Sequence, residues 1–241
     1  YMSDYGVFAM VAVALLVSLA LGFINGILVA KAKIMPFIAT LATMMGYRGL
    51  ALLSTPDAGN IPITNTAFFE MGEGMLFGVV PVPLLILIGC WVAAAVVLNK
   101  TSLGRHIYAV GGNAEAARMI VKAYAICGLM AGLSGLIVAA RGQTGQPSLG
   151  AGIEMEAVAA VVLGGAVLTG GIGTVTGSVL GMIVLRIISN MINLQGDISY
   201  YFQNFITGVL VLVIVIVQSR NVLGKRQKTD SGEEGAVQQT T

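Results

Sequence analysis

The residues of this chain that could carry out catalysis are few and scattered. The single histidine, His106, and the two cysteines, Cys90 and Cys127, have no partner at the spacing of a metal site or of a nucleophile–base pair. An enzyme needs such a group of residues at one place. We therefore expect no catalytic residue, no metal ligand and no cofactor bound by this chain.

Two arginines, Arg48 and Arg186, fall within apolar stretches. Counting outward from a turn near Gly170–Gly173 places Arg186 within about one helical turn of the depth of Glu154 and Glu156. A charge in apolar surroundings is costly unless it is paired. We therefore predict an ion pair between Arg186 and one of these two carboxylates.

Uncharged polar residues also occur inside apolar stretches. An asparagine in such surroundings must find a hydrogen-bond partner, so it usually points toward other protein groups. Two interpretations stay open: these side chains bond neighbouring helices to one another, or they line a pathway for a neutral solute. The candidate pathway residues are Asn25, Thr40, Thr43, Asn190 and Asn204.

The elements that must hold these residues are membrane-spanning helices. Apolar residues make up 56% of the 241 positions and charged residues only 10%, whereas a soluble domain carries about a quarter charged residues. The apolar runs approach the roughly 20 residues that a spanning helix needs, and they lack the alternation of barrel strands. The sequence thus predicts an all-α polytopic membrane protein with about seven transmembrane helices. They are Gly6–Ala30, Pro36–Ser54, Val79–Asn99, Ala123–Arg141, Glu154–Thr169, Thr174–Ile192 and Gln203–Val217.

Lysine and arginine orient these spans, because cytoplasmic loops are enriched in both. With the first residue outside and the last inside, ten of the thirteen basic residues fall on the cytoplasmic side. Because Tyr1 then lies outside with no leader-like segment before it, we expect further spans upstream. We expect a transmembrane domain over residues 1–224 and a disordered cytoplasmic tail over 225–241. The ten basic residues are Lys31, Lys33, Lys100, Arg105, Arg118, Lys122, Arg220, Lys225, Arg226 and Lys228.

Glycines recur at four-residue spacing along the predicted spans. In lipid, small residues let helix backbones approach closely, so this spacing predicts tightly crossed helices. Such packing is equally typical of channels, transporters and intramembrane enzymes. The spaced glycines are Gly22 with Gly26, Gly128 with Gly132, and Gly173 with Gly177 and Gly181.

The segment Lys100–Lys122 is the longest predicted cytoplasmic loop. Two adjacent glycines permit a sharp reversal, Asn113 is a favoured helix N-cap, and Glu115 suits the first turn of a helix. The short helix expected here either lies on the membrane face of its own protein or docks on a cytoplasmic partner. The candidate docking residues are Gly111, Gly112, Asn113, Glu115, Ala116, Ala117 and Arg118.

The loop motif GGN-x-x-AAR, followed by a span, resembles the cytoplasmic loop of the permeases of ribose-, galactose- and xylose-type ABC sugar importers. Three other segments are similar to the same family in the same order: Gly22–Leu53, Gly128–Arg141 and Ala157–Val184. The resemblance extends over most of the chain, from about Gly22 to Val217.

This resemblance implies a permease subunit in the bacterial inner membrane that moves a sugar or sugar-like molecule. Two permease copies, as a homodimer, would enclose one pathway, and a periplasmic substrate-binding protein would deliver the substrate. ATP-binding cassette ATPase subunits would use ATP and Mg²⁺ and press on Gly111–Arg118; this sequence itself has no GxxxxGK[ST] motif. Membrane lipid is the other expected partner, and nucleic acid is not, because there is no large basic face.

An ion-coupled secondary transporter of a small neutral solute is the alternative. Such proteins often contain inverted repeats and interrupted helices, and the glycine-rich segment Gly164–Gly173 resembles an interruption. The near absence of intramembrane carboxylates and of a clear repeat favours the importer. Co-purification with an ATPase subunit distinguishes the two. Pentose, hexose, inositol-like polyol and autoinducer-type cyclic sugar derivative substrates all remain open.

Overall fold

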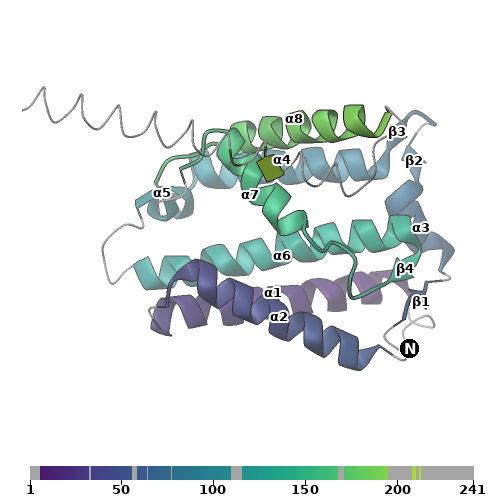
Figure 1. Ribbon diagram of the computed structural model, residues 1–241, viewed down its shortest axis with the longest axis horizontal. Helices are drawn as coiled ribbons and strands as arrows, with labels where there is room; N and C mark the ends of the chain where they lie inside the picture. The colour runs from purple at the N-terminus through teal and green to yellow at the C-terminus, as the bar shows by residue number, and fades with distance from the viewer. Residues whose placement is uncertain are drawn as a thin grey trace, which may run out of the picture. The chain divides into compact units, whose positions relative to one another are not determined.

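The computed structural model describes residues 6–32, 34–55, 59–63, 65–76, 78–109, 116–167, 171–194, 208, 209 and 212 (Figure 1). The chain divides into two compact units, Tyr1–Ile153 and Glu154–Thr241. We call them unit 1 and unit 2.

Five helices in the described part of the chain are long and apolar enough to cross a membrane. Their bounds agree with five of the predicted spans to within a few residues, except that the fourth begins seven residues early. At the start of the second, Pro36 fits because its missing N–H would have no partner there. The predicted total of about seven is not confirmed. The five are α1 (Val7–Ala32), α2 (Pro36–Ser54), α4 (Val82–Lys100), α6 (Ala116–Gly142) and α8 (Val175–Leu194).

The predicted fifth span, Glu154–Thr169, is short and glycine-rich in the sequence, and the helix in it is too short for a full crossing. The helix found there, α7 (Ile153–Leu163), has 11 residues and is therefore about 16 Å long, roughly half the thickness of the hydrocarbon core. It ends because Gly165 adopts a φ of 89°, a conformation that favours glycine. The predicted seventh span, Gln203–Val217, lies almost wholly outside the described residues, and the tail 225–241 lies entirely outside them.

Unit 1 is built on the antiparallel pair of α1 and α6, with α2 along α1 (Figure 1). At one end of α6 the short helix α3 (Thr66–Glu73) inserts Phe68, which is only 2% exposed. α4 contacts α3 at one end and the short helix α5 (Ser102–Ala109) at the other. Two short antiparallel strand pairs complete the unit: β1 (Ile61–Pro62) with β4 (Thr144–Gly145), and β2 (Met75–Leu76) with β3 (Val80–Pro81).

The two ends of unit 1 differ in charge, as the predicted orientation requires. One end, which we call the basic end, contains the last turns of α1 and α4, the helix α5 and the first turns of α6 (Figure 1). The opposite end, the acidic end, contains α3, with Glu70 and Glu73 exposed, and the strands. One exposed basic residue, Arg141 in the last turn of α6, also lies there. The described basic residues of the basic end are Lys31, Lys100, Arg105, Arg118 and Lys122.

Unit 2 is the pair of α7 and α8. Its small core consists of Ala159, Ala160 and Leu185, with Leu163 and Met182 packed against them. The alanines of α7 leave room for the backbone of α8 to come close, which is the arrangement that the glycine spacing in α8 predicted.

Candidate functional site

The crossing of α1 and α6 is a contact of backbone on backbone. A Cβ atom placed on Gly128 would lie 2.5 Å from the carbonyl oxygen of Ser18 and 2.8 Å from the Cα of Gly22. A Cβ atom on Gly22 would in turn lie 2.5 Å from the carbonyl oxygen of Tyr124. No side chain fits in that space, so the predicted close crossing at these glycines is confirmed.

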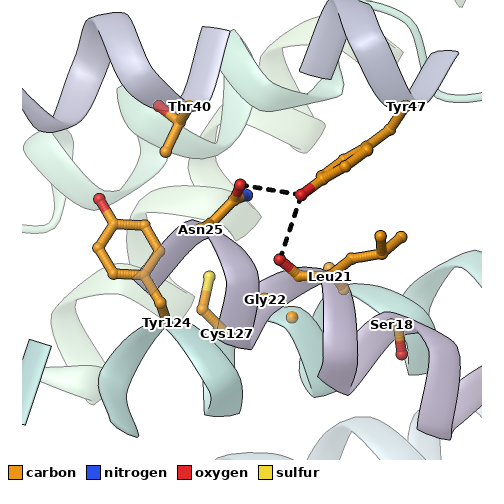
Figure 2. Close-up of a pocket in the computed structure, with 10 residues that line it drawn as sticks. Ser18, Leu21, Gly22, Asn25, Thr40, Tyr47, Tyr124 and Cys127 are labelled. Atoms are coloured by element: carbon orange, nitrogen blue, oxygen red, sulfur yellow. Dashed lines mark hydrogen bonds between the residues drawn. The ribbon is translucent and has the colours of Figure 1, made fainter. Parts of the chain in front are cut away.

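Beside this crossing, α1, α2 and α6 line an open cleft of about 290 Å³ (Figure 2). Helical spacing explains how the side chains gather there. On each of α1 and α6, four lining residues follow one another at i, i+3, i+4 and i+7, which is one face of a helix. The lining residues are Ser18, Leu21, Gly22 and Asn25 from α1, Thr40 and Tyr47 from α2, and Tyr124, Cys127, Gly128 and Ala131 from α6.

A hydrogen bond between Tyr47 and Asn25 ties α2 to α1 across the cleft. The Tyr47 hydroxyl donates to Asn25 Oδ1 at 3.2 Å and also lies 3.5 Å from the carbonyl oxygen of Leu21 (Figure 2). One hydroxyl proton serves one acceptor at a time, and the shorter contact is to Asn25. This bond fixes the plane of the Asn25 amide group.

The other hydroxyl groups of the cleft divide into two kinds. Ser18 donates to the carbonyl oxygen of Leu15 at 3.0 Å, and Thr40 donates to that of Pro36 at 3.0 Å, so both use their proton within their own helix. By contrast, within the described ranges neither the Tyr124 hydroxyl nor the Asn25 side-chain nitrogen has a hydrogen-bond partner. An unpaired donor in apolar surroundings is destabilising. The cleft therefore contains two donors without a described partner, and none of its ten lining residues is charged.

The structure brings together two of the five predicted pathway residues, Asn25 and Thr40. Thr43 donates to the carbonyl oxygen of Ala39 within α2 at 3.1 Å and does not line the cleft. Asn190 is exposed on α8 in unit 2, and Asn204 lies outside the described residues.

The sequence reasoning missed both tyrosines of the cleft. A usable signal was present, because Ser18, Gly22 and Asn25 form a polar and small-residue stripe on α1. Tyr124 and Gly128 form a matching pair four residues apart on α6. Extending the search from single polar residues to whole helix faces would have found Tyr124.

In unit 2 the structure pairs Arg186 with Glu156, one of the two predicted partners. Arg186 Nη2 lies 2.7 Å from Glu156 Oε2, with the side chains 55% and 33% exposed, respectively. Glu154 is not the partner in this pair. Close packing near the ion pair holds the two helices together, because Gly181 lies against the backbone of Ala160.

The predicted docking loop is only partly described. Gly111, Gly112, Asn113 and Glu115 lie outside the described residues, whereas Ala116, Ala117 and Arg118 form the first turn of α6. No break separates this turn from the membrane span, so these three residues do not belong to a separate short helix. A short helix does precede the loop: α5, which sequence reasoning did not predict, carries Arg105 and His106. α5 contacts α4 and α6 at the basic end.

The exposure of the long helices defines the class of protein. In the most apolar 18-residue stretch of each of the five span-length helices, only 0% to 11% of the residues are buried within the structure. Helices that face lipid require such exposed apolar surfaces. Among the described residues, no group of three or more His, Cys, Asp or Glu could hold a metal ion. The chain is a multi-pass helical membrane protein.

Comparison with known sequences then gives the family. Residues 1–215 match the family described as "Branched-chain amino acid transport system / permease component". The chain belongs to this family of membrane permeases.

Similar curated proteins carry more specific names. The chain is 39% identical over 208 residues to the ribose import permease protein RbsC of Bacillus subtilis (strain 168), covering 81% of this chain and 63% of that protein. For RbsC of Escherichia coli (strain K12) the identity is 39% over 225 residues, covering 87% and 68%, respectively. For the L-arabinose transport system permease protein AraH of E. coli (strain K12) it is 37% over 211 residues, covering 84% and 63%.

The chain thus spans about two thirds of the length of these curated relatives, 63% to 68%. No solved structure matches it. Family membership and the apolar helices together make it a multi-pass protein of the inner membrane.

Proposed function

We propose that this chain is the membrane-spanning permease subunit of an ATP-binding cassette importer that moves a sugar across the inner membrane. The observation that carries the proposal is its similarity, over more than four fifths of its length, to proteins named for ribose import and L-arabinose transport. A separate ATPase subunit supplies the energy in this proposal, since the chain has no GxxxxGK[ST] motif of its own.

The basic end of unit 1 suits the contact with that ATPase. α5 and the first turn of α6 lie together there, and Arg118 is exposed. From Arg118, α6 continues without a break past Tyr124 and Gly128 to the acidic end. Arg118 and Tyr124 are six residues apart, or about 9 Å along the helix axis. A displacement at Arg118 therefore reaches the cleft through a single rigid helix.

The α1–α6 crossing transmits such a displacement further. Because the two backbones are in contact at Gly22 and Gly128, α6 cannot slide without moving α1. Alternating access requires two arrangements of these helices with different contacts to the ATPase in each. In the same proposal, the acidic end meets a periplasmic substrate-binding protein, and a second permease copy completes the pathway.

Uptake in proteoliposomes tests this function. The full-length permease is reconstituted with its cognate ATPase and binding protein, and accumulation of radiolabelled pentoses, hexoses and polyols is measured. We expect uptake of at least one sugar that requires both ATP and the binding protein. Uptake driven by an ion gradient without the ATPase would contradict the proposal and favour a secondary transporter.

Reversing the charge at Arg118 tests the coupling role of the basic end. We expect Arg118→Glu to lower ATP-dependent uptake by about tenfold or more, because a like-charge contact at an interface costs several kcal/mol. Arg118→Lys should retain most uptake. Arg141→Gln, at the other end of the same helix, is the matched control and should bind the ATPase normally. Unchanged uptake in Arg118→Glu would show that this residue does not dock on the ATPase.

A further inference from the structure

The cleft between α1, α2 and α6 contains polar groups that the protein itself leaves unsatisfied. The Asn25 side-chain nitrogen and the Tyr124 hydroxyl have no hydrogen-bond partner among the residues that the structure describes. Asn25 lies in the apolar helix α1, where hydrocarbon provides no acceptor. Tyr124 lies nearer the basic end of its helix, two residues after Lys122. Whatever fills the cleft must therefore accept hydrogen bonds.

The charge of the cleft limits what that occupant is. None of the ten lining residues is charged, so a phosphate or an amino-acid zwitterion would bury its charge without a counterion, which is strongly unfavourable. The occupant is therefore neutral. This separates the cleft's chemistry from an amino-acid substrate, even though the description of the family names amino acids.

Size and hydrogen bonding narrow the class further. About 290 Å³ is at the lower limit of the roughly 300–1,000 Å³ of small-molecule pockets, which suits a monosaccharide. The Thr40 hydroxyl donates its hydrogen bond within α2, so its oxygen can still accept one. The Ser18 hydroxyl lies against Gly132 of α6, which does not line the cleft. A small cleft that contains two donors and a hydroxyl acceptor suits the hydroxyl groups of a sugar.

We propose that this cleft is a binding site for a neutral sugar of pentose size. Asn25 and Tyr124 donate hydrogen bonds to its hydroxyl groups, and the hydroxyl oxygen of Thr40 accepts from them. Tyr47 is a positioning residue, because its hydrogen bond fixes the Asn25 amide group. The transport role of the site rests on the proposed function, but the binding does not.

Cys127 lines the cleft and provides a reporter at the site itself. The experiment uses the full chain in lipid nanodiscs with Cys90, which lies on α4 and does not line the cleft, replaced by serine. The rate at which N-ethylmaleimide labels Cys127 is measured by mass spectrometry with D-ribose, L-arabinose, ribose 5-phosphate or leucine present. We expect a neutral pentose to slow labelling at least about threefold in a saturable way, and the two charged compounds to leave it unchanged.

Tyr124→Phe supplies the decisive variant, because the hydroxyl that it removes bonds no described protein group. We expect it to raise the pentose concentration that gives half-protection by about 3- to 10-fold, the loss of one hydrogen bond. Thr43→Val is the matched control: it removes a hydroxyl that is satisfied within α2 and lies outside the cleft, so protection should not change. Equal effects of the two variants would overturn the site.

The remaining outcomes separate the site from the transport function. Failure of every neutral pentose to slow labelling, or failure of Cys127 to be labelled at all, would overturn the site even if uptake is observed. Saturable protection without ATP-dependent uptake would support the site and contradict the importer. Labelling slowed by lipid chain length and not by any sugar would identify the cleft as a lipid site and overturn the proposal.

Discussion

The α1–α6 crossing in unit 1 and the α7–α8 crossing in unit 2 depend on the same kind of backbone contact. In both, a glycine of one helix lies against the backbone of the other: Gly128 against Gly22 in unit 1, and Gly181 against Ala160 in unit 2. Hydrocarbon gives helices little reason to associate, so each crossing depends on this close fit.

The polar groups beside the two crossings differ in whether they have hydrogen-bond or ion-pair partners. In unit 2 the charges of Arg186 and Glu156 satisfy each other at 2.7 Å. In unit 1, Asn25 and Tyr124 keep donors that no described residue accepts. Glycine packing alone therefore does not distinguish a structural contact from a binding site. The difference lies in whether the neighbouring polar groups are already paired.

The largest effect is expected from filling the α1–α6 contact. Gly128→Ala places a Cβ atom 2.5 Å from the Ser18 carbonyl oxygen, so the backbones must separate, and we expect a loss of about 2–3 kcal/mol of unfolding free energy. Gly135→Ala is the matched control on the same helix, because nothing lies within 4 Å of its added Cβ. Unfolding in SDS, followed by circular dichroism, compares the two. Equal stability of both variants would mean that the crossing is looser than the structure shows.

An intermediate effect is expected from the ion pair of unit 2. Arg186→Met leaves Glu156 as an unpaired charge, and Glu156→Met does the same to Arg186. We expect either variant to lose about 1–2 kcal/mol of unfolding free energy, and the double variant to lose less than the sum. The double-mutant cycle in detergent is its own control. An additive result would show that the two side chains do not interact in the folded protein.

The sequence predicted most of the helices but not the partners of their polar residues. Pro36–Ser54 was correct at both ends, because Pro36 begins the helix and extended Thr55 ends it. The start of α6 was placed at Ala123 and lies at Ala116, since the segment Ala116–Arg118 is helix-forming and joins the span. The length of α7 was wrong because helix termination depends on the φ angle of Gly165, which composition does not reveal.

The cleft was harder to predict than the spans for a physical reason. Asn25 and Thr40 are polar residues in apolar runs, so each can be identified as a candidate from the sequence by itself. Tyr47 and Tyr124 do not, because tyrosine is common in membrane helices, and their roles depend on which faces of three helices meet. The spacing of glycines shows that helices cross closely, but it does not show which helix supplies the partner.

The smallest effect contrasts the two tyrosines of the cleft. Tyr47→Phe removes the hydrogen bond to Asn25, and we expect it to cost about 0.5–1 kcal/mol of unfolding free energy. Tyr124→Phe removes a hydroxyl without a described partner, so it should change stability by less than about 0.5 kcal/mol or raise it slightly. SDS unfolding of both variants in the absence of sugar measures this difference. Saturating pentose should raise the unfolding free energy of the protein. We expect Tyr124→Phe to lose more of this ligand-dependent gain than it loses in unfolding free energy without sugar, so the order of the two variants should reverse. A Tyr124→Phe variant that is clearly destabilised without ligand would mean that its hydroxyl is paired with protein, and that unit 1, like unit 2, has already satisfied its polar groups.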